Sequence, residues 1–331
     1  MIKPLLAFLT AFAFALVLMP VVIKYFKKKR ATQTILSYVE EHKEKNGTAT
    51  MGGIVFIIVA VVLSFVFLSY NTTWFVCLLV SVFFGILGFM DDFIKIKHKQ
   101  NLGLKAYQKV IGQLGISLIF ALFIYFENKS GTIYLPFSNL KINITFWVIP
   151  LIIFVLVATT NSVNLTDGLD GLAGSVSLVY LFVFSVITAI IAFKQYSAGE
   201  TGQMLENIKN LSTLSMIFAG AILGFLMFNT NKAKIFMGDV GSLCLGGYIG
   251  AVACCLGFEL LVPILGVCFV FSSISVILQV AVFKLKHKRI FKMAPFHHHL
   301  QMSGLSEAKV CAIYSATTLV VGMFAVIFYL I

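Results

Sequence analysis

Charged residues are scarce in this chain. They make up 11% of its 331 residues, whereas a soluble domain carries about 25%. Apolar residues make up 60% of the chain, which is enough for about ten membrane-spanning helices of roughly 20 residues each. This composition excludes a soluble enzyme, a disordered chain and a receptor with a large extramembrane domain.

Paired cysteine motifs are also missing. The six cysteines lie in apolar stretches and form no CxxC pair. We therefore interpret them as small apolar residues within the membrane, because neither a disulfide framework nor a metal site has this pattern. They are Cys77, Cys244, Cys254, Cys255, Cys268 and Cys311.

Long apolar runs are what the chain does have. They predict an all-α, polytopic integral membrane protein that forms one transmembrane domain over residues 1–331. The first run is not a cleavable signal peptide, because KYFKKKR follows it without a small-residue cleavage site. Pro263 predicts that the ninth run tilts, kinks or splits. The ten runs are 4–23, 51–70, 73–90, 110–126, 144–160, 174–193, 211–228, 240–258, 259–283 and 310–331.

The loops between these runs alternate in charge. Twenty of the 25 Lys and Arg residues fall in the loops that follow odd-numbered runs. Basic loops stay in the cytosol, so we expect both termini outside, and the net charge of +12 does not require nucleic acid as a partner. The predicted cytosolic, active-site loops are 24–50, 91–109, 161–173, 229–239 and 284–309.

Aspartates and histidines gather on the same predicted side. All five aspartates and all six histidines fall on the cytosolic face, whereas solvated loops would scatter them over both faces. We therefore expect this face to be an active or binding surface. The residues are Asp91, Asp92, Asp167, Asp170, Asp239, His42, His98, His287, His297, His298 and His299.

Two adjacent carboxylates close the third run, in GFMDDFIKIKHKQNLGLKAYQK. Such a pair is costly at a bilayer surface unless it is paired or binds a cation. Neighbours on a helix do not share a face, so Asp91 and Asp92 are expected to have different roles. Lys95 and Lys109 are placed to neutralise phosphates. The alternative, a solvated stop-transfer flank, explains the lysines better than the acidic pair.

The segment NSVNLTDGLDGLAG, residues 161–174, contains no Lys or Arg. We expect Asp167 and Asp170 on one side of a helical turn, beside glycines that allow close backbone approach. Asn161 and Asn164 add amides at the same spacing. This set can bind a cation through oxygen or a polar ligand through hydrogen bonds. The alternative is an Asp-Gly turn with a helix cap.

Three further loops carry candidate residues. In FNTNKAKIFMGDVGSLCLGG, Asp239 is a metal-ligand candidate or a helix N-cap, and Phe236 stacks on a base or anchors at the interface. In MAPFHHH, the histidine spacing matches no ordinary zinc site and suits phosphate contacts or a solvated loop. Lys45, in HKEKNGTATMGG, lies just before a small-residue turn into the second run and is interpreted as a positive flank.

Acids, lysines and histidines on one face suit phosphate chemistry. Basic groups and a divalent cation neutralise a phosphorylated substrate, and a carboxylate positions or deprotonates the nucleophile. Magnesium suits an oxygen-rich set of this kind. We therefore expect a soluble phosphorylated donor to meet an acceptor dissolved in the membrane.

These segments resemble the polyprenyl-phosphate N-acetylhexosamine-1-phosphate transferase superfamily. The match runs from Lys45 to Lys309 and includes GTATMGG, DDFIK, NSVNLTDGLDGLA, FNT, FMGDVGSL and SVILQV. MAPFHHH points to its phospho-N-acetylmuramoyl-pentapeptide transferase branch. One departure is Ala49, where the family usually has Pro; it removes no catalytic group.

The resemblance implies ten transmembrane helices in a bacterial inner membrane, with the active site on the cytosolic face. It implies transfer of phospho-N-acetylmuramoyl-pentapeptide from its UDP carrier to undecaprenyl phosphate, which yields lipid I and UMP with Mg²⁺ as cofactor. It also implies a homodimer and a groove for the polyprenyl chain beside the bent ninth helix.

The resemblance assigns roles to residues of this chain. Asp91, Asp92 and Asp239 are the catalytic acids, with Asp239 the first choice as Mg²⁺ ligand and Asp91 the second. Either Asp91 or Asp92 is the base or the lipid-phosphate positioner, in a one-step or a two-step route. The implied uridine pocket consists of Lys45, Asn164, Gly168, Leu169, Asp170, Asn229 and Phe236. The implied phosphate or metal-site contacts are Lys95, Lys109, Asp167, His298 and His299. Of these, we also count His298 as catalytic.

Two alternatives remain at this point. A sister transferase would use another UDP-N-acetylhexosamine, which the histidine block disfavours. A transporter would place ionisable residues near the bilayer midplane, where this chain has almost none.

Overall fold

The fold was analysed in a computed structural model of the chain. The described residues are 2–29, 47–98, 100, 102–128, 131–138, 140–230 and 232–331. Within them the chain is almost entirely helical, as expected where lipid cannot satisfy backbone polar groups. The long helices are α1 (Ile2–Lys28), α3 (Thr72–His98), α4 (Ala106–Asn128), α5 (Val148–Thr166), α6 (Leu172–Ser197), α7 (Gln203–Asn229), α8 (Gly238–Cys255), α10 (Val267–Lys286) and α12 (Glu307–Leu330).

Short elements complete the fold. α2 (Ile54–Phe67), α9 (Val262–Leu265) and α11 (Phe296–Gln301) are short helices, and η2 (Thr145–Trp147) and η3 (Glu259–Leu261) are single 3-10 turns. β1 (Thr132–Tyr134) and β2 (Lys141–Asn143) form an antiparallel hairpin in which Ile133 pairs with Ile142.

The expected all-α, multi-pass architecture is confirmed. Among the described residues, nine helices are long and apolar enough to cross a membrane. The second predicted run, 51–70, forms only the 14 residues of α2. It is shorter than predicted because Gly52 and Gly53 donate their backbone N–H groups to the carbonyls of Phe236 and Met237, which holds the start of the run outside the helix.

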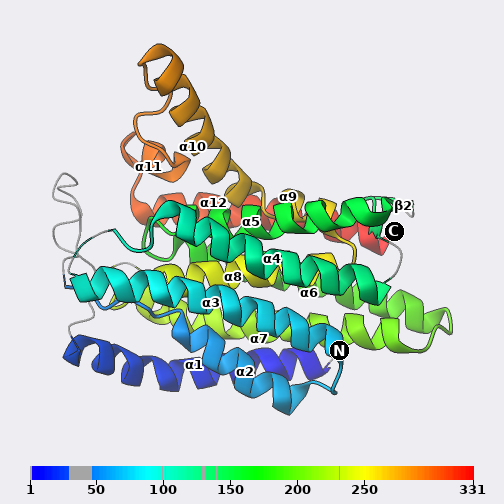
Figure 1. Ribbon diagram of the computed structural model, residues 1–331. Helices are drawn as coiled ribbons and strands as arrows, with labels where there is room; N and C mark the ends of the chain where they lie inside the picture. The colour runs from blue at the N-terminus through cyan, green and yellow to red at the C-terminus, as the bar shows by residue number, and fades with distance from the viewer. Residues whose placement is uncertain are drawn as a thin grey trace.

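The ninth run splits, which was one of the outcomes predicted from Pro263. Pro263 lies in the first turn of α9, and the chain leaves helical geometry at Gly266 before α10 begins. Figure 1 shows α10 departing from the bundle at an angle, with α11 beside it. The break therefore directs the second half of this run away from the other helices.

α7 and α8 form the centre of the bundle. Their apolar spans are 83% buried, far more than those of the helices around them. α3 and α5 pack on α8, while α1 and α6 pack on α7. Glycines permit the closest of these contacts: a Cβ atom on Gly88 of α3 would lie 2.6 Å from the backbone nitrogen of Val240.

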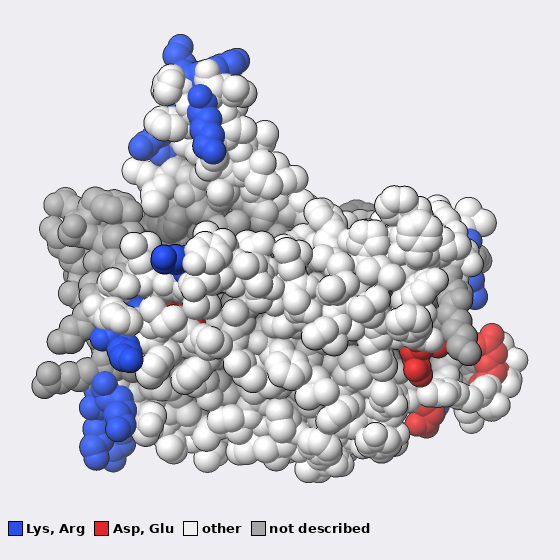
Figure 2. All heavy atoms as spheres, in the orientation of Figure 1, with Lys and Arg blue, Asp and Glu red and all other residues white. Residues whose placement is uncertain are grey.

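The two ends of the bundle differ in charge. Both termini lie at one end, which we call the terminal end (Figure 1). The opposite end carries the helix ends Lys28, His98, Thr166 and Asn229, and we call it the basic end. Figure 2 shows Lys and Arg gathered at the basic end and on the projecting α10, and Asp and Glu at the terminal end. The charge asymmetry of the sequence is thus an asymmetry of the fold.

Candidate active site

Three aspartates meet at the basic end of the bundle. Asp91 and Asp92 come from the last turns of α3, and Asp239 comes from the first turn of α8. One carboxylate oxygen of each lies within 4.8 Å of the others. The α3–α8 packing brings them together, because Gly88, one turn before Asp91 and Asp92, lies against the Asp239 backbone.

Two lysines lie within this cluster. The Lys109 Nζ atom is 2.9 Å from Asp239 Oδ2, and the Lys95 Nζ atom is 3.2 Å from the same oxygen. Lys95 also contacts Asp91 Oδ2 at 2.5 Å. The two side chains are only 18% and 28% exposed, so these ion pairs are shielded from water and are stronger than surface pairs. Lys95 and Lys109, the predicted phosphate contacts, thus both lie within the aspartate cluster.

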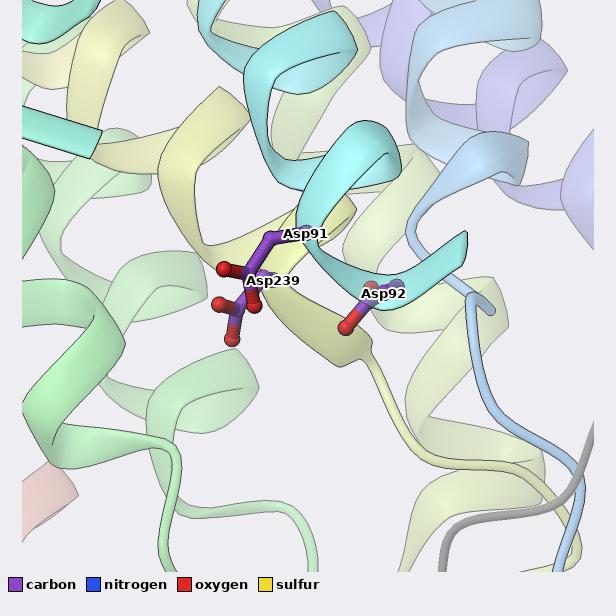
Figure 3. Close-up of side chains that lie close together, drawn as sticks. All are labelled: Asp91, Asp92 and Asp239. Atoms are coloured by element: carbon purple, nitrogen blue, oxygen red, sulfur yellow. The ribbon is translucent and has the colours of Figure 1, made fainter. Parts of the chain in front are cut away.

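Asp91 and Asp92 have different environments, as their adjacent helical positions predicted. Figure 3 shows the Asp91 carboxylate beside that of Asp239, with Asp92 set apart. The backbone N–H of Leu104 donates to Asp91 at 2.9 Å. The N–H of Val240 donates to Asp92 at 3.1 Å, so Asp92 caps the start of α8. The predicted N-cap function thus belongs to Asp92, and the Asp239 side chain remains with the lysines.

Asn164 also supports Asp239. Its amide nitrogen donates to Asp239 Oδ1 at 2.8 Å and to Ser242 Oγ at 2.9 Å. The Lys109 Nζ atom donates to its amide oxygen at 3.4 Å. Asn164 therefore orients the carboxylate in the structure, while its predicted place is the uridine pocket. Ser242 was missed in the sequence, although it follows Asp239 by one helical turn.

The loop after α5 does not form the predicted helical turn. α5 ends at Thr166, and residues 167–171 form turns before α6. The Asp170 carboxylate accepts the backbone N–H of Ala233 at 3.0 Å. Gly171 takes a positive φ of 77°, which glycine adopts at little cost. The Asp-Gly repeat thus favoured a turn here over a continued helix.

Asp167 is half-buried in this loop. Burial, followed by the negative charges of Asp239, Asp92 and Asp170, raises the pKa of Asp167 to about 8. Its pKa therefore responds to the charge of the aspartate cluster. This supports the predicted proximity of Asp167 to the charged site.

Asn229 ties two loops of the site together. Its side-chain oxygen accepts the Gly171 N–H at 3.0 Å, and its side-chain nitrogen donates to the Ile235 carbonyl at 2.8 Å. Both groups therefore bond to backbone. Asn229 therefore holds the Asp-Gly loop, through Gly171, beside the segment that precedes α8, through Ile235.

Phe236 is half-buried in the loop that precedes α8. Its backbone N–H donates to the Ala49 carbonyl at 2.8 Å, and its carbonyl accepts the Gly52 N–H at 2.9 Å. Ala49 thus contributes a backbone bond in which its side chain takes no part. Leu169 is buried, and the predicted contact Lys45 lies outside the described residues.

The histidine block forms α11 against the Asp-Gly loop. A Cβ atom on Gly168 would lie 2.9 Å from His298 Nε2 and would also collide with His297. His298 and Gly168 are therefore neighbours, as the predicted site requires. His299 faces its own loop: its Nδ1 atom accepts the Lys292 N–H at 3.1 Å, and its ring stacks on Phe296.

His297 was not singled out in the sequence. It is fully buried, and neither ring nitrogen has a hydrogen-bond partner among the described residues. Burial, followed by the charge of His298, lowers the pKa of His297 to about 3, so its ring is neutral at neutral pH. Because His297, His298 and His299 are consecutive and identical, the sequence alone could not predict which of them is buried.

The aspartate cluster fits a hard divalent cation. Its donor atoms are all carboxylate oxygens, the ligands that Mg²⁺ prefers in proteins. Three carboxylates face two ammonium groups. A cation at this point would offset the excess negative charge.

The amino-acid sequence of this chain is similar to those of known proteins. Residues 74–257 match the profile of Glycosyl transferase family 4. A phospho-N-acetylmuramoyl-pentapeptide-transferase of Clostridium novyi (strain NT) is 44% identical over 94% of this chain and 92% of its own length. Proteins of the same name from Halalkalibacterium halodurans and Staphylococcus aureus (strain bovine RF122 / ET3-1) are each 38% identical; the alignments cover 97% and 95% of this chain and 96% of each relative.

Proposed function

The chain belongs to Glycosyl transferase family 4 and, within it, to the phospho-N-acetylmuramoyl-pentapeptide transferases, and we propose from this premise that it makes lipid I. The donor is UDP-N-acetylmuramoyl-pentapeptide, the acceptor is undecaprenyl phosphate, and UMP is released. This is the first membrane step of peptidoglycan synthesis.

One observation carries this proposal. Three aspartates, Asp91, Asp92 and Asp239, and two lysines converge at one end of a bundle of apolar helices. Buried charges of this density are costly in a membrane protein and mark a functional site. Lysines beside carboxylates suit a reaction in which phosphate charge is transferred between two substrates.

Asp239 and Asp91 are the residues that would hold Mg²⁺, because their carboxylates lie side by side (Figure 3). When bound, the cation supplies neutralisation of the diphosphate charge and polarisation of the phosphorus–oxygen bond. Asn164 and Lys109 keep the Asp239 carboxylate oriented.

The transfer is a single displacement. A phosphate oxygen of undecaprenyl phosphate forms a bond to the sugar-linked phosphorus, and the bond from that phosphorus to the bridging oxygen breaks. UMP leaves with the electron pair of the broken bond. Asp92, set apart from the other two carboxylates, acts on the acceptor phosphate as base or as positioning residue. Lys95 and Lys109 neutralise the phosphates on both sides of the reacting bond.

The donor lies across the loops that surround the cluster. The Phe236 ring stacks on uracil, and Gly168, Leu169 and Asp170 line the uridine pocket with Lys45. Asn229 keeps the pocket closed through its bonds to Gly171 and Ile235. His298, beside Gly168, contacts phosphate, and His299 orients this segment.

The protein sits in the bacterial plasma membrane with its basic end in the cytosol. The gathering of Lys and Arg at that end (Figure 2) supports this orientation, which leaves both termini outside. The polyprenyl chain lies beside α10, which departs from the bundle (Figure 1). We expect a homodimer.

A UMP-release assay tests the proposal. Purified protein receives undecaprenyl phosphate, Mg²⁺ and either UDP-N-acetylmuramoyl-pentapeptide or UDP-N-acetylglucosamine. Release of UMP from the first donor alone supports the proposed function. Activity on UDP-N-acetylglucosamine alone would assign the chain to a sister transferase.

A transporter is the alternative of another class. The presence of Asp91, Asp167 and Asp239 at one end of the bundle argues for the enzyme, because transporter sites lie near the bilayer midplane. Sided labelling of single-cysteine variants would exclude the enzyme if these positions were reached from opposite sides.

A further inference from the structure

The half of α4 beside the site, residues 106–119, has few means of attachment to the bundle. Every residue in this range is described, and its only buried side chains are Gln113 and Ser117. Tyr107, Val110 and Ile111 are exposed. Apolar side chains gain little by moving from lipid to protein, so the partly buried Ile116, which packs against the core, does little to fix this half of α4.

A pair of amides joins this half of α4 to α5. Gln113 Oε1 accepts a hydrogen bond from Asn161 Nδ2 at 2.9 Å, and Gln113 Nε2 donates to Asn161 Oδ1 at 3.4 Å. Asn161 is anchored in turn, because its Nδ2 atom also donates to the Val157 carbonyl at 2.7 Å. Each amide thus offers both a donor and an acceptor to the other, which fixes the register of the two helices.

Helical spacing connects this pair to the site. Gln113 follows Lys109 by four residues on α4, and Asn161 precedes Asn164 by three residues on α5, so each pair shares one helix face. The Lys109 Nζ atom lies 3.4 Å from Asn164 Oδ1. Lys109 Nζ donates to Asp239 Oδ2 at 2.9 Å, and Asn164 Nδ2 donates to Asp239 Oδ1 at 2.8 Å. Two polar pairs, Gln113–Asn161 and Lys109–Asn164, thus lie one helical turn apart along the α4–α5 interface, and the second pair bonds to the Asp239 carboxylate.

We propose that the Gln113–Asn161 amide pair positions Lys109 on Asp239, which makes Gln113 and Asn161 positioning residues for the phosphoryl transfer. The proposal rests on the proposed function. Lys109 is carried by a lightly attached half-helix, and its ammonium group must stay at a fixed distance from the reacting phosphates. The amide pair supplies the constraint that apolar packing does not.

The first test is the accessibility of Lys109. Gln113→Leu keeps the side chain similar in size and removes both interhelical hydrogen bonds. We expect a water-soluble amine-reactive reagent to modify Lys109 several-fold faster in this variant, measured by peptide mass spectrometry. Lys209, which lies over the Tyr196 ring at the terminal end, is the internal reference and should react at the wild-type rate. Unchanged modification of Lys109 would overturn the proposal.

The second test is a double-mutant cycle on turnover. Gln113→Leu should lower kcat by about tenfold, the factor that a good interhelical hydrogen-bonded pair in a bilayer supplies. In a Lys109→Gln background the same change should have no further effect, because its path to the site is already lost. An equal loss in both backgrounds would show a general structural role and overturn the proposal.

Matched variants complete the design. Asn210→Leu removes a buried amide that bonds to Ser69 at the terminal end; it should lower thermal stability and leave kcat unchanged. The exchange of Gln113→Asn with Asn161→Gln keeps both amides and should restore most of the lost turnover. The wild-type protein tests the proposed function separately, because that function fails if the wild-type protein releases no UMP. The rate of Lys109 modification in Gln113→Leu would still show whether the Gln113–Asn161 pair holds Lys109 in place.

Discussion

The two ends of the bundle use polar residues in different ways. At the terminal end, mostly neutral groups tie the loop between α2 and α3 to α7: Ser69 donates to exposed Glu206 at 3.0 Å, and Asn210 donates to the Ser69 carbonyl at 3.3 Å. At the basic end, three aspartates and two lysines are packed within ion-pair distance. Ties between helices need only hydrogen bonds, so the surplus of buried charge distinguishes a reaction site from a structural contact.

The largest difference between the ends should come from neutralising one carboxylate at each of them. Asp239→Asn removes the carboxylate that both lysines contact, and we expect kcat to fall by about 10³-fold or more, because electrostatic groups at the reacting centre carry losses of this size. Glu206→Gln should be close to wild type. UMP release measures activity, and circular dichroism in detergent checks the fold. Near-normal turnover of Asp239→Asn would contradict the assigned role.

A smaller loss is expected from the lysines. Lys109→Gln should lower kcat by roughly 10²-fold, because one of two neutralising charges remains on Lys95. Lys209, at the terminal end, lies over the Tyr196 ring, and Lys209→Gln should leave turnover unchanged. Steady-state kinetics at varied donor concentration measures both. Equal effects of the two changes would remove the distinction between the ends.

Asparagine provides a third pair. Asn229→Ala leaves the Gly171 N–H and the Ile235 carbonyl without their partners, and unpaired buried groups of this kind cost about 1–3 kcal/mol each. We expect a lower melting temperature and about a tenfold higher KM for the donor, through displacement of the pocket loops. Asn207→Ala loses a bond to Asn71 at the terminal end and should change only stability. A donor KM raised equally by both would refute the role given to Asn229.

The smallest effect concerns two carboxyl groups with raised pKa values. Burial and the charges of Asp239, Asp92 and Asp170 raise the pKa of Asp167 to about 8, whereas burial alone raises the pKa of Glu259, in the η3 turn at the terminal end, to about 8. Both lie outside the nine long helices. In Asp239→Asn, the pKa of Asp167 should fall, and that of Glu259 should stay. Infrared titration of the carboxyl bands without Mg²⁺ measures this.

The sign of the stability effect follows from the same values. Between the ordinary pKa of each group and about pH 8, the folded chain holds a proton that the unfolded chain has released. The contribution of Asp167 and Glu259 to stability is therefore complete below pH 4 or so and is lost as the pH rises through about 8. The variants Asp167→Asn and Glu259→Gln should each flatten this decline. If Asp167→Asn or Glu259→Gln left the pH dependence of stability unchanged, the assignment of that residue would be contradicted.

Much of the architecture could be predicted from the sequence because lipid imposes simple rules on composition. Apolar runs located the helices, and a split was one of the outcomes predicted from Pro263. The loops in which Asp91, Asp92 and Asp239 lie predicted that all three are at the same end. The adjacent positions of Asp91 and Asp92 also predicted their different environments.

Partners across helices could not be predicted in this way. The bond from Asn164 to Asp239, the tie from Asn229 to Gly171 and the burial of His297 depend on which helix faces lie together, and spacing along one helix carries no such information. Gln113 shows the limit clearly. One glutamine in an apolar run has no pattern, and its role follows only from Asn161, 48 residues away.

The contact of Gly88 with the Asp239 backbone has a mechanical consequence. No side chain lies between α3 and α8 at this point, so no rotamer can yield there when the bilayer thins or the temperature rises. Direct backbone contact therefore sets the distance between the main chains that carry the three carboxylates. A side chain at position 88 would therefore push α3 and α8 apart and move Asp91 and Asp92 away from Asp239.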